Sequence, residues 1–155
     1  MKRGKKHNKS KSLKRQLKDS LEFRQNIQGY HPTPMAVAHW FSKLNATLFG
    51  NRLGRVHIEI KKLHHDWGRC VASWDGRQAP KGKFDQRKLP HHLVEGYYIQ
   101  LHSKFPTWKD FIETLAHEMV HLYQMTVLKD PYSNHNENFY AFRPRFESAG
   151  LKLYR

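Results

Sequence analysis

The chain has 155 residues, the size of one ordinary domain, and its 28 lysines and arginines against 13 acidic residues give a net charge of +15. Its single cysteine, Cys70, excludes a disulfide framework and a zinc ribbon built from paired Cys-x-x-Cys motifs, and favours a reducing compartment. No apolar run reaches the ~18 residues of a membrane helix, and the first twenty residues lack the apolar core of a secretory signal. We therefore expect a soluble, cytoplasmic protein whose charge favours polyanionic partners.

The N-terminal segment, residues 1–24, is predicted to be a basic, disordered tail. Residues 1–18 hold no acid and nine cations, which we predict to bind nucleic acid: Lys2, Arg3, Lys5, Lys6, Lys9, Lys11, Lys14, Arg15 and Lys18. Such a segment buries too little apolar surface to fold alone, although Leu13, Leu17 and Leu21 allow a short amphipathic helix over about 12–24. Clustered cations neutralise phosphates and release counterions, which favours contact with nucleic acid over the alternative of a solvated tail.

The body of the chain begins with a helix and continues with strands. Thr33 is a helix cap, apolar residues follow Pro34 at helical spacing, and Gly50 ends the helix. From Val56 the apolar period changes to two, as in a half-buried strand. The predicted strands are 56–61, 69–74 and 97–102, with a long exposed loop over 75–92. Three strands between helices indicate an α+β fold.

A second long helix carries the strongest chemical motif. Thr107 is its expected N-cap, and Asp110 stands at the capping-box position before an apolar run that ends near Leu128. Inside this helix lies the pattern His-Glu-x-x-His, formed by His117, Glu118 and His121. Side chains at i and i+4 share one helix face, so both imidazoles can bind one metal. Glu118 beside them can accept a proton from a metal-bound water. We interpret the motif as a zinc site; the alternative is two surface histidines.

A catalytic zinc usually has three protein ligands and an open position, so a third ligand must lie elsewhere in the chain. His135 is the preferred candidate because it opens a last helix, which follows a turn and can fold back beside the first. Pro144 should kink that helix or end its first segment. Glu137 and Glu147 are the alternative ligands.

Other residues leave alternatives open. Three residues are candidates to stabilise a tetrahedral oxyanion, and the sequence does not choose among them: Tyr132, Tyr140 and Arg143. We interpret the adjacent histidines at 64–65 and 91–92 as solvated or phosphate-contacting loop residues. The alternative is a second metal site, but adjacent side chains in loops rarely converge on one ion. Trp67 and Trp74 can stack on unpaired bases, although Trp74 on its strand favours core packing.

The order of these motifs resembles the SprT-like (Spartan-type) metalloproteases over roughly residues 35–153. The stretches that carry the resemblance are 41–45, 48–53, 68–72, 98–102, 113–121 and 135–139. The resemblance implies a zincin-like minimal metalloprotease domain over 25–155, in which a small three-stranded sheet packs on helices that include the HExxH helix. It implies Zn²⁺ held by His117, His121 and His135, with Glu118 as general base.

Characterised relatives in this family are stimulated by DNA and act on DNA-bound or DNA-crosslinked proteins. Many bacterial relatives add a four-cysteine zinc ribbon, which the single cysteine forbids here, so DNA affinity would come from the basic tail and body. The compact form suits a bacterial or phage-borne member, acting in the cytoplasm.

The sequence therefore predicts a DNA-associated zinc metalloprotease. On the zincin geometry that the resemblance implies, the substrate would lie along an edge strand at 97–102 by strand addition. The alternative is a basic nucleic-acid-binding protein with a structural zinc or a nucleolytic metal site. Glu118 favours the protease, because a structural zinc does not require a carboxylate beside it.

Overall fold

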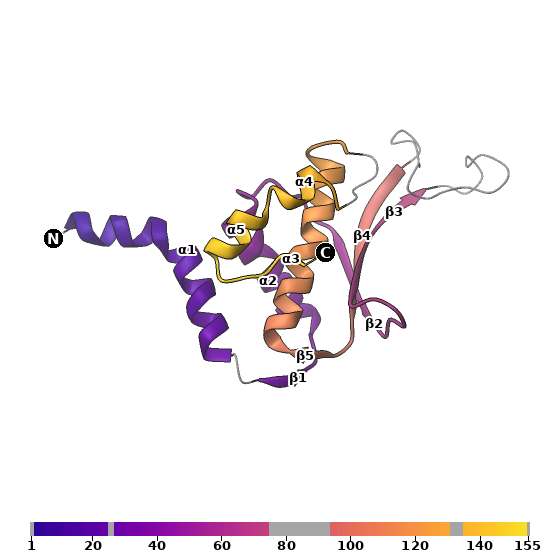
Figure 1. Cartoon of the computed structure of the whole chain (residues 1–155), viewed down its shortest axis with the longest axis horizontal. Coiled ribbons are helices and arrows are strands. Elements are labelled where there is room, and N and C mark those ends of the chain that lie inside the picture. The colour runs from indigo at the N-terminus through magenta and orange to yellow at the C-terminus, as the bar shows by residue number, and fades with distance from the viewer. Residues whose placement is uncertain (1, 25–26, 75–93, 131–134, 155) are drawn as a thin grey trace.

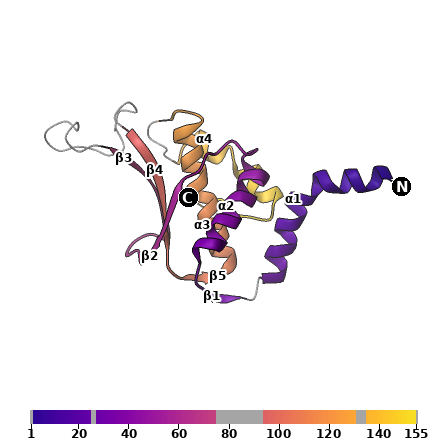
Figure 2. The same cartoon turned by 180° about the vertical axis from the view of Figure 1, so that it is seen from behind.

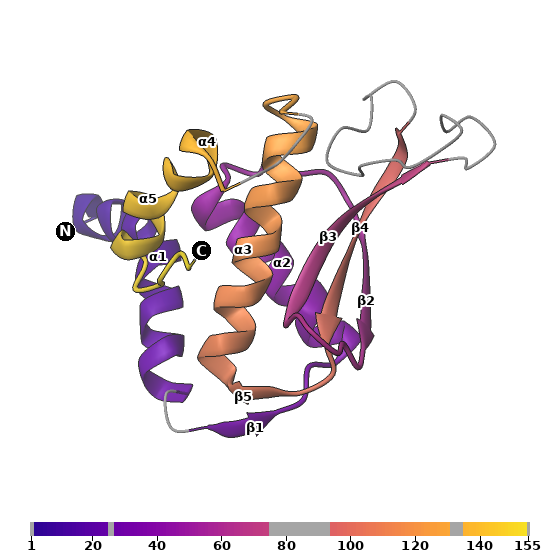
Figure 3. The same cartoon turned by 45° about the vertical axis from the view of Figure 1, so that its right-hand side comes forward.

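The computed structural model describes residues 2–24, 27–74, 94–130 and 135–154, with side chains from residue 13 onward except those of Trp74 and Glu95. The described elements, in chain order, are α1 (Lys2–Arg24), β1 (Gln28–Tyr30), α2 (Pro34–Leu48), β2 (His57–Lys61), β3 (Gly68–Trp74), β4 (Val94–His102), β5 (Phe105–Thr107), α3 (Trp108–Thr126), α4 (Glu137–Tyr140) and α5 (Arg143–Ser148). Helix α3 runs through the middle, with a three-stranded sheet on one side and α1 and α5 on the other (Figures 1 and 3). The fold is mixed α+β, as predicted. The loop predicted at 75–92 lies outside the described residues.

Local capping signals place both long helices where the sequence predicts them. The Thr33 hydroxyl caps α2 by accepting the Ala36 N–H at 3.2 Å, and Gly50 follows the helix with a φ of +58°. The Thr107 hydroxyl accepts the Asp110 N–H at 3.1 Å and donates to the Asp110 carboxylate at 2.8 Å. These paired bonds fix the first turn of α3, and with it the direction in which the later residues of that helix point.

The three predicted strands form one sheet in the order β2-β4-β3. Strand β4 is central, since it pairs in parallel with β2 and antiparallel with β3. The prediction that residues 97–102 form a free edge is therefore wrong: both sides of this strand are hydrogen-bonded, and its Ile99 and Leu101 are fully buried. Strand β3 lies against α3, and among the described strands nothing pairs with its outer edge (Figure 3).

A second, two-stranded sheet was not predicted from the sequence. Strand β1 pairs antiparallel with β5, with Gln28 opposite Thr107 and Tyr30 opposite Phe105. The ring of Tyr30 also packs on Phe111 of α3, with the ring centroids 5.1 Å apart. The strand pair therefore anchors the beginning of α3. Within the described residues, none of the helices has the length and apolar character needed to cross a bilayer.

The last helical segment folds back beside α3, as predicted, and is divided near Pro144 into α4 and α5. The Asn136 side chain caps α4 by accepting the Phe139 N–H at 3.2 Å. Phe139 and Phe146 are fully buried against the core. This packing brings residue 135 next to α3.

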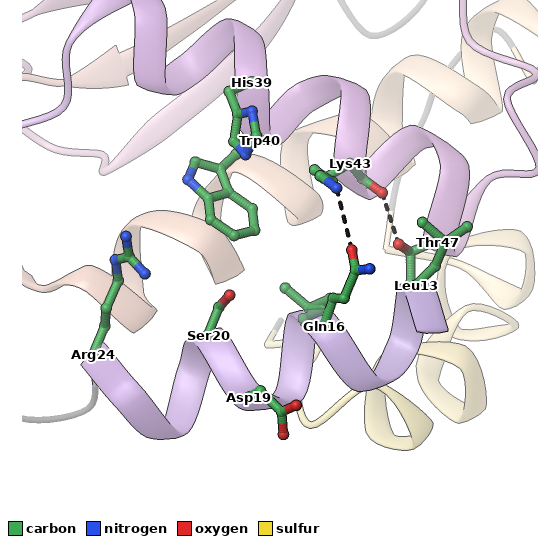
Figure 4. Close-up of a pocket in the computed structure, with 10 residues that line it drawn as sticks. Leu13, Gln16, Asp19, Ser20, Arg24, His39, Trp40, Lys43 and Thr47 are labelled. Carbon is green, nitrogen blue, oxygen red and sulfur yellow. Dashed lines mark hydrogen bonds between the residues drawn. The ribbon is translucent and has the colours of Figure 1, made fainter. Parts of the chain in front are cut away.

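Helix α1 differs from the disordered tail expected for residues 1–24. Its backbone is helical throughout, and its first half projects away from the rest of the domain (Figures 1 and 2). Leu17 and Leu21 are only 3% and 6% exposed and belong to the core, and Lys43 of α2 donates a hydrogen bond to Gln16 at 3.2 Å (Figure 4). Residues 13–24 thus pack on the domain, because the rest of the chain supplies the apolar surface that the segment lacks. The division into a tail and a domain stays a prediction.

Candidate metal centre

Three histidines converge where α3 meets the segment before α4. His117 and His121 come from α3, and His135 comes from the residues just before α4. One ring nitrogen from each lies within 4.8 Å of the other two, and the Nε2 atoms of His117 and His121 are 3.3 Å apart. The i and i+4 spacing accounts for the first pair, and the fold-back of the last segment adds the third. The alternative ligands Glu137 and Glu147 are exposed and lie outside this cluster.

The donor set suits a bound metal ion. Burial, together with the neighbouring rings of His121 and His135, lowers the pKa of His117 to about 3, so this imidazole is neutral at pH 7 with a lone pair to share. The fully buried Phe139 ring lies behind the cluster, with centroids 5.0 Å from His117, 5.0 Å from His121 and 4.4 Å from His135. Three convergent imidazoles before an apolar wall could hold a metal ion.

The two helical histidines are oriented by hydrogen bonds from their second ring nitrogens. The His117 ring bonds to the Tyr154 backbone, and because this bond raises the His117 pKa, the carbonyl is the acceptor. Nδ1 of His121 lies 3.0 Å from Oε1 of Gln124, whose side chain is fully buried. These partners leave Nε2 of each ring for a metal, and a metal-bound histidine commonly has such a partner.

Gln124 also connects the ligands on α3 to the segment that carries His135. Its Nε2 donates to Oδ1 of Asn136 at 3.1 Å and, over 3.4 Å, to the Asp130 carboxylate. Asn136 in turn donates to Asp130 at 2.8 Å. A role for Gln124 was not predicted from the sequence, although its place three residues after His121, on the same helix face, is a signal that could have found it.

Glu118 lies beside the histidines at the junction of α3 and β3. Only 7% of it is exposed, and burial, reinforced by the charge of Asp66, raises its pKa to about 8. A hydrogen bond from the Cys70 backbone opposes that shift. Gly68 permits this close approach, because a Cβ at that position would lie 3.1 Å from Glu118 Cγ and 2.8 Å from a methyl of Thr114. A buried carboxylate next to a metal site is suited to proton transfer.

A cleft of about 360 Å³ opens onto Glu118 and His117. Its walls come from the start of β3, from α3 and from the C-terminal segment, where Tyr154 contributes. Trp67, half exposed, lines the cleft, and its ring packs at a tilt against the rings of His102 and Phe105. Neither Tyr154 nor Trp67 was predicted from the sequence to lie at this site.

The remaining candidates are distributed as follows. Tyr140 and Arg143 pair with each other, with the guanidinium 4.8 Å from the ring centroid, and neither is among the described residues that line the cleft. Tyr132 and the histidines at 91–92 lie outside the described residues, as does the side chain of Trp74. His64 and His65 are exposed, and within the described residues they join no cluster of metal-binding side chains.

Of the nine cations predicted to contact nucleic acid, the structure describes the side chains of Lys14, Arg15 and Lys18. All three are exposed on α1, and Arg15 pairs with Asp19 at 3.3 Å. The other six lie in the part of α1 whose side chains are not described. Their role in binding stays a prediction.

A comparison with curated protein sequences finds no match. The model of the SprT-like family matches residues 37–153, most of the chain, including α3 and the segment that carries His135. The chain therefore belongs to the SprT-like family.

Proposed function

We propose that the protein is a zinc-dependent metalloprotease that acts on DNA-associated proteins. The proposal rests on one observation: three imidazoles converge next to the buried Glu118, and Glu118 and His117 line one cleft. The family is associated with metalloprotease-like enzymes, and three histidines with an open position are the ligand set of a hydrolytic zinc.

The chain's own residues divide the chemistry of peptide hydrolysis. Zn²⁺ held by His117, His121 and His135 would supply the Lewis acidity that polarises a carbonyl and activates water near neutral pH. Glu118 takes the proton from the attacking water and returns it to the leaving amine. The Cys70 backbone bond holds the Glu118 carboxylate in place, so proton transfer requires little side-chain movement.

The substrate is proposed to lie along β3 rather than β4. Strand β3 borders the cleft at Gly68 and, among the described strands, has an unpaired outer edge. An extended peptide can add to such an edge through main-chain hydrogen bonds. Because these bonds do not depend on side chains, peptides of different sequence could bind in this way. Trp67 and Tyr154 at the cleft would then contact substrate side chains.

Association with DNA is proposed from charge. The chain carries a net charge of +15, and nine of its cations lie within residues 2–18 of α1, six of them on its projecting first part. Phosphate neutralisation by these cations would concentrate enzyme and DNA-bound substrate on one strand, which raises the effective substrate concentration.

The decisive experiment compares wild type with Glu118→Gln, using zinc-loaded protein and an unfolded protein substrate, with and without single-stranded DNA. We expect Glu118→Gln to keep about one zinc per chain and to lose cleavage by ~10²–10⁴-fold. Glu137→Gln, an exposed acid near the same histidines, is the matched control and should retain activity. If wild type binds zinc but cleaves no protein, the proposed protease activity is refuted, and a nucleic-acid-binding protein with a structural zinc is favoured. Degradation of nucleic acid that Glu118→Gln abolishes would favour a nuclease.

A further inference from the structure

The groove between α1 and α2 contains a cavity of about 450 Å³ (Figure 4). The indole of Trp40 lines it, with the cations Arg24 and Lys43 at its sides and the polar groups of Gln16, Ser20 and Thr47 around it. It shares no lining residue with the cleft at Glu118. A cavity of this volume is large enough for one small ligand.

The two cations in this cavity are not neutralised by carboxylates in the described part of the chain. The Lys43 ammonium donates to the neutral amide of Gln16 at 3.2 Å. The Arg24 guanidinium lies 5.2 Å from the ring centroid of Trp108 and forms no described ion pair. The single acid that lines the cavity, Asp19, pairs with Arg15 and points away from α2 in Figure 4. The cavity thus combines an aromatic wall with uncompensated positive charge.

A second cavity, of about 530 Å³, continues the same groove. It shares Leu13 and Thr47 with the first, and Lys14, Arg15 and Lys18 line it. The groove therefore presents cations of α1 between Lys14 and Arg24, with Lys43 of α2, and one half-buried indole at its end. A flat, uncharged ring joined to anionic phosphates is the ligand that matches this arrangement.

We propose that the α1–α2 groove binds single-stranded nucleic acid, with one unpaired base against Trp40 and its phosphates at Lys43 and Arg24. Neighbouring phosphates then follow Lys14, Arg15 and Lys18. Stacking on an aromatic side chain is tolerant of sequence, and backbone contacts with cations supply the remaining affinity. This inference rests on the proposed association with DNA and assigns it a site on the folded part of α1, beyond the N-terminal cations alone.

The test measures binding of a labelled twelve-nucleotide oligothymidylate to the full chain by fluorescence anisotropy over a range of salt. Lys43→Gln and Arg24→Gln should each weaken binding and reduce the slope of log K against log salt by about 0.7. Lys62→Gln removes an exposed charge elsewhere and should leave the slope unchanged. Trp40→Phe should weaken binding more than Lys62→Gln does. Because Trp40 also packs on Trp108, the melting temperature of this variant is measured in parallel to check that it folds.

The outcomes separate this site from the proposed function. If wild type binds the oligonucleotide and Lys43→Gln and Arg24→Gln weaken binding no more than Lys62→Gln does, the groove is not the binding site. The proposed association with DNA would then still stand. Duplex DNA competing as well as the single strand would contradict base stacking at Trp40. No binding by wild type would overturn the association itself, and DNA-independent cleavage of protein through Glu118 would still be measured separately. The same titration with a twelve-nucleotide oligouridylate compares the affinity of the groove for RNA with its affinity for DNA.

Discussion

Replacing Gln124 with methionine is expected to weaken zinc binding by about 10–100-fold, or about 1.4–2.7 kcal/mol, although Gln124 is not a ligand. The amide of Gln124 is oriented by its neighbours: its Nε2 faces the oxygens of Asp130 and Asn136, so its Oε1 faces Nδ1 of His121 at 3.0 Å. His121 is therefore protonated on Nδ1 and keeps the lone pair of Nε2, which faces His117. Methionine has a similar volume but cannot accept this bond.

The magnitude follows from the bonds that are lost. Asp130 keeps the bond from Asn136 at 2.8 Å, and Asn136 keeps the bond from the Phe139 N–H at 3.2 Å, so neither loses all its partners. The principal loss is the orientation of His121 and the tie to the segment that holds His135. The three hydrogen bonds of Gln124 contribute about 1.5–4.5 kcal/mol to folding, which corresponds to roughly 3–18 °C in melting temperature for a domain of this size.

The assay is a competition titration of zinc against a fluorescent chelator, with the melting temperature of the metal-free protein measured in parallel. Asn45→Leu is the matched control, since Asn45 is a buried amide that bonds to the backbone of Leu53 at 2.9 and 3.1 Å, away from the metal centre. It should lower the melting temperature and leave zinc affinity unchanged. If Gln124→Met behaves like this control, Gln124 only stabilises the fold and the reasoning is refuted.

Three further predictions concern the same centre. His135→Ala should lose most of the bound zinc in a metal analysis, whereas Glu137→Ala should keep it; the reverse would move the third ligand to Glu137. Gly68→Ala should cut peptide hydrolysis about 10–100-fold with zinc retained, because its Cβ would lie 3.1 Å from Glu118 Cγ, whereas Gly96→Ala meets only a hydroxyl at 3.8 Å and should be active. In metal-free protein, burial raises the pKa of Glu118 to about 8, so the folded state binds the extra proton and stability due to this group falls as pH rises from about 4.5 to about 8. Urea unfolding should show Glu118→Gln gaining stability over wild type between pH 5 and pH 8, and a constant difference would contradict the shift.

The sequence predicted those parts of the fold that local chemistry determines. Thr33 and Thr107 act as caps because each hydroxyl lies within reach of an N–H three residues later. The alternation from Val56 predicted a strand for the same local reason. Predicting that His117 and His121 lie together required only the helical repeat. Predicting His135 beside them required in addition that the last segment folds back against α3.

The errors arose where the outcome depends on residues far apart in the chain. Periodicity shows that a strand exists but not which strands flank it, so it could not place β4 between β2 and β3. Composition predicts that residues 1–24 lack the apolar surface to fold alone. It does not show that Leu17 and Leu21 find that surface on the rest of the domain.

The correct strand order changes how Glu118 and a substrate are related. In an antiparallel pair, alternate residues turn their backbone groups toward the partner strand and the residues between turn them outward. The Cys70 backbone bonds to Glu118, so it faces the outer edge of β3 rather than β4. Ala72, two residues on, faces the same edge and is the next position at which an extended peptide can pair. In the mechanism proposed above, the strand that holds Glu118 would therefore also set the register of the substrate, and a one-residue slip would move the scissile bond away from Glu118.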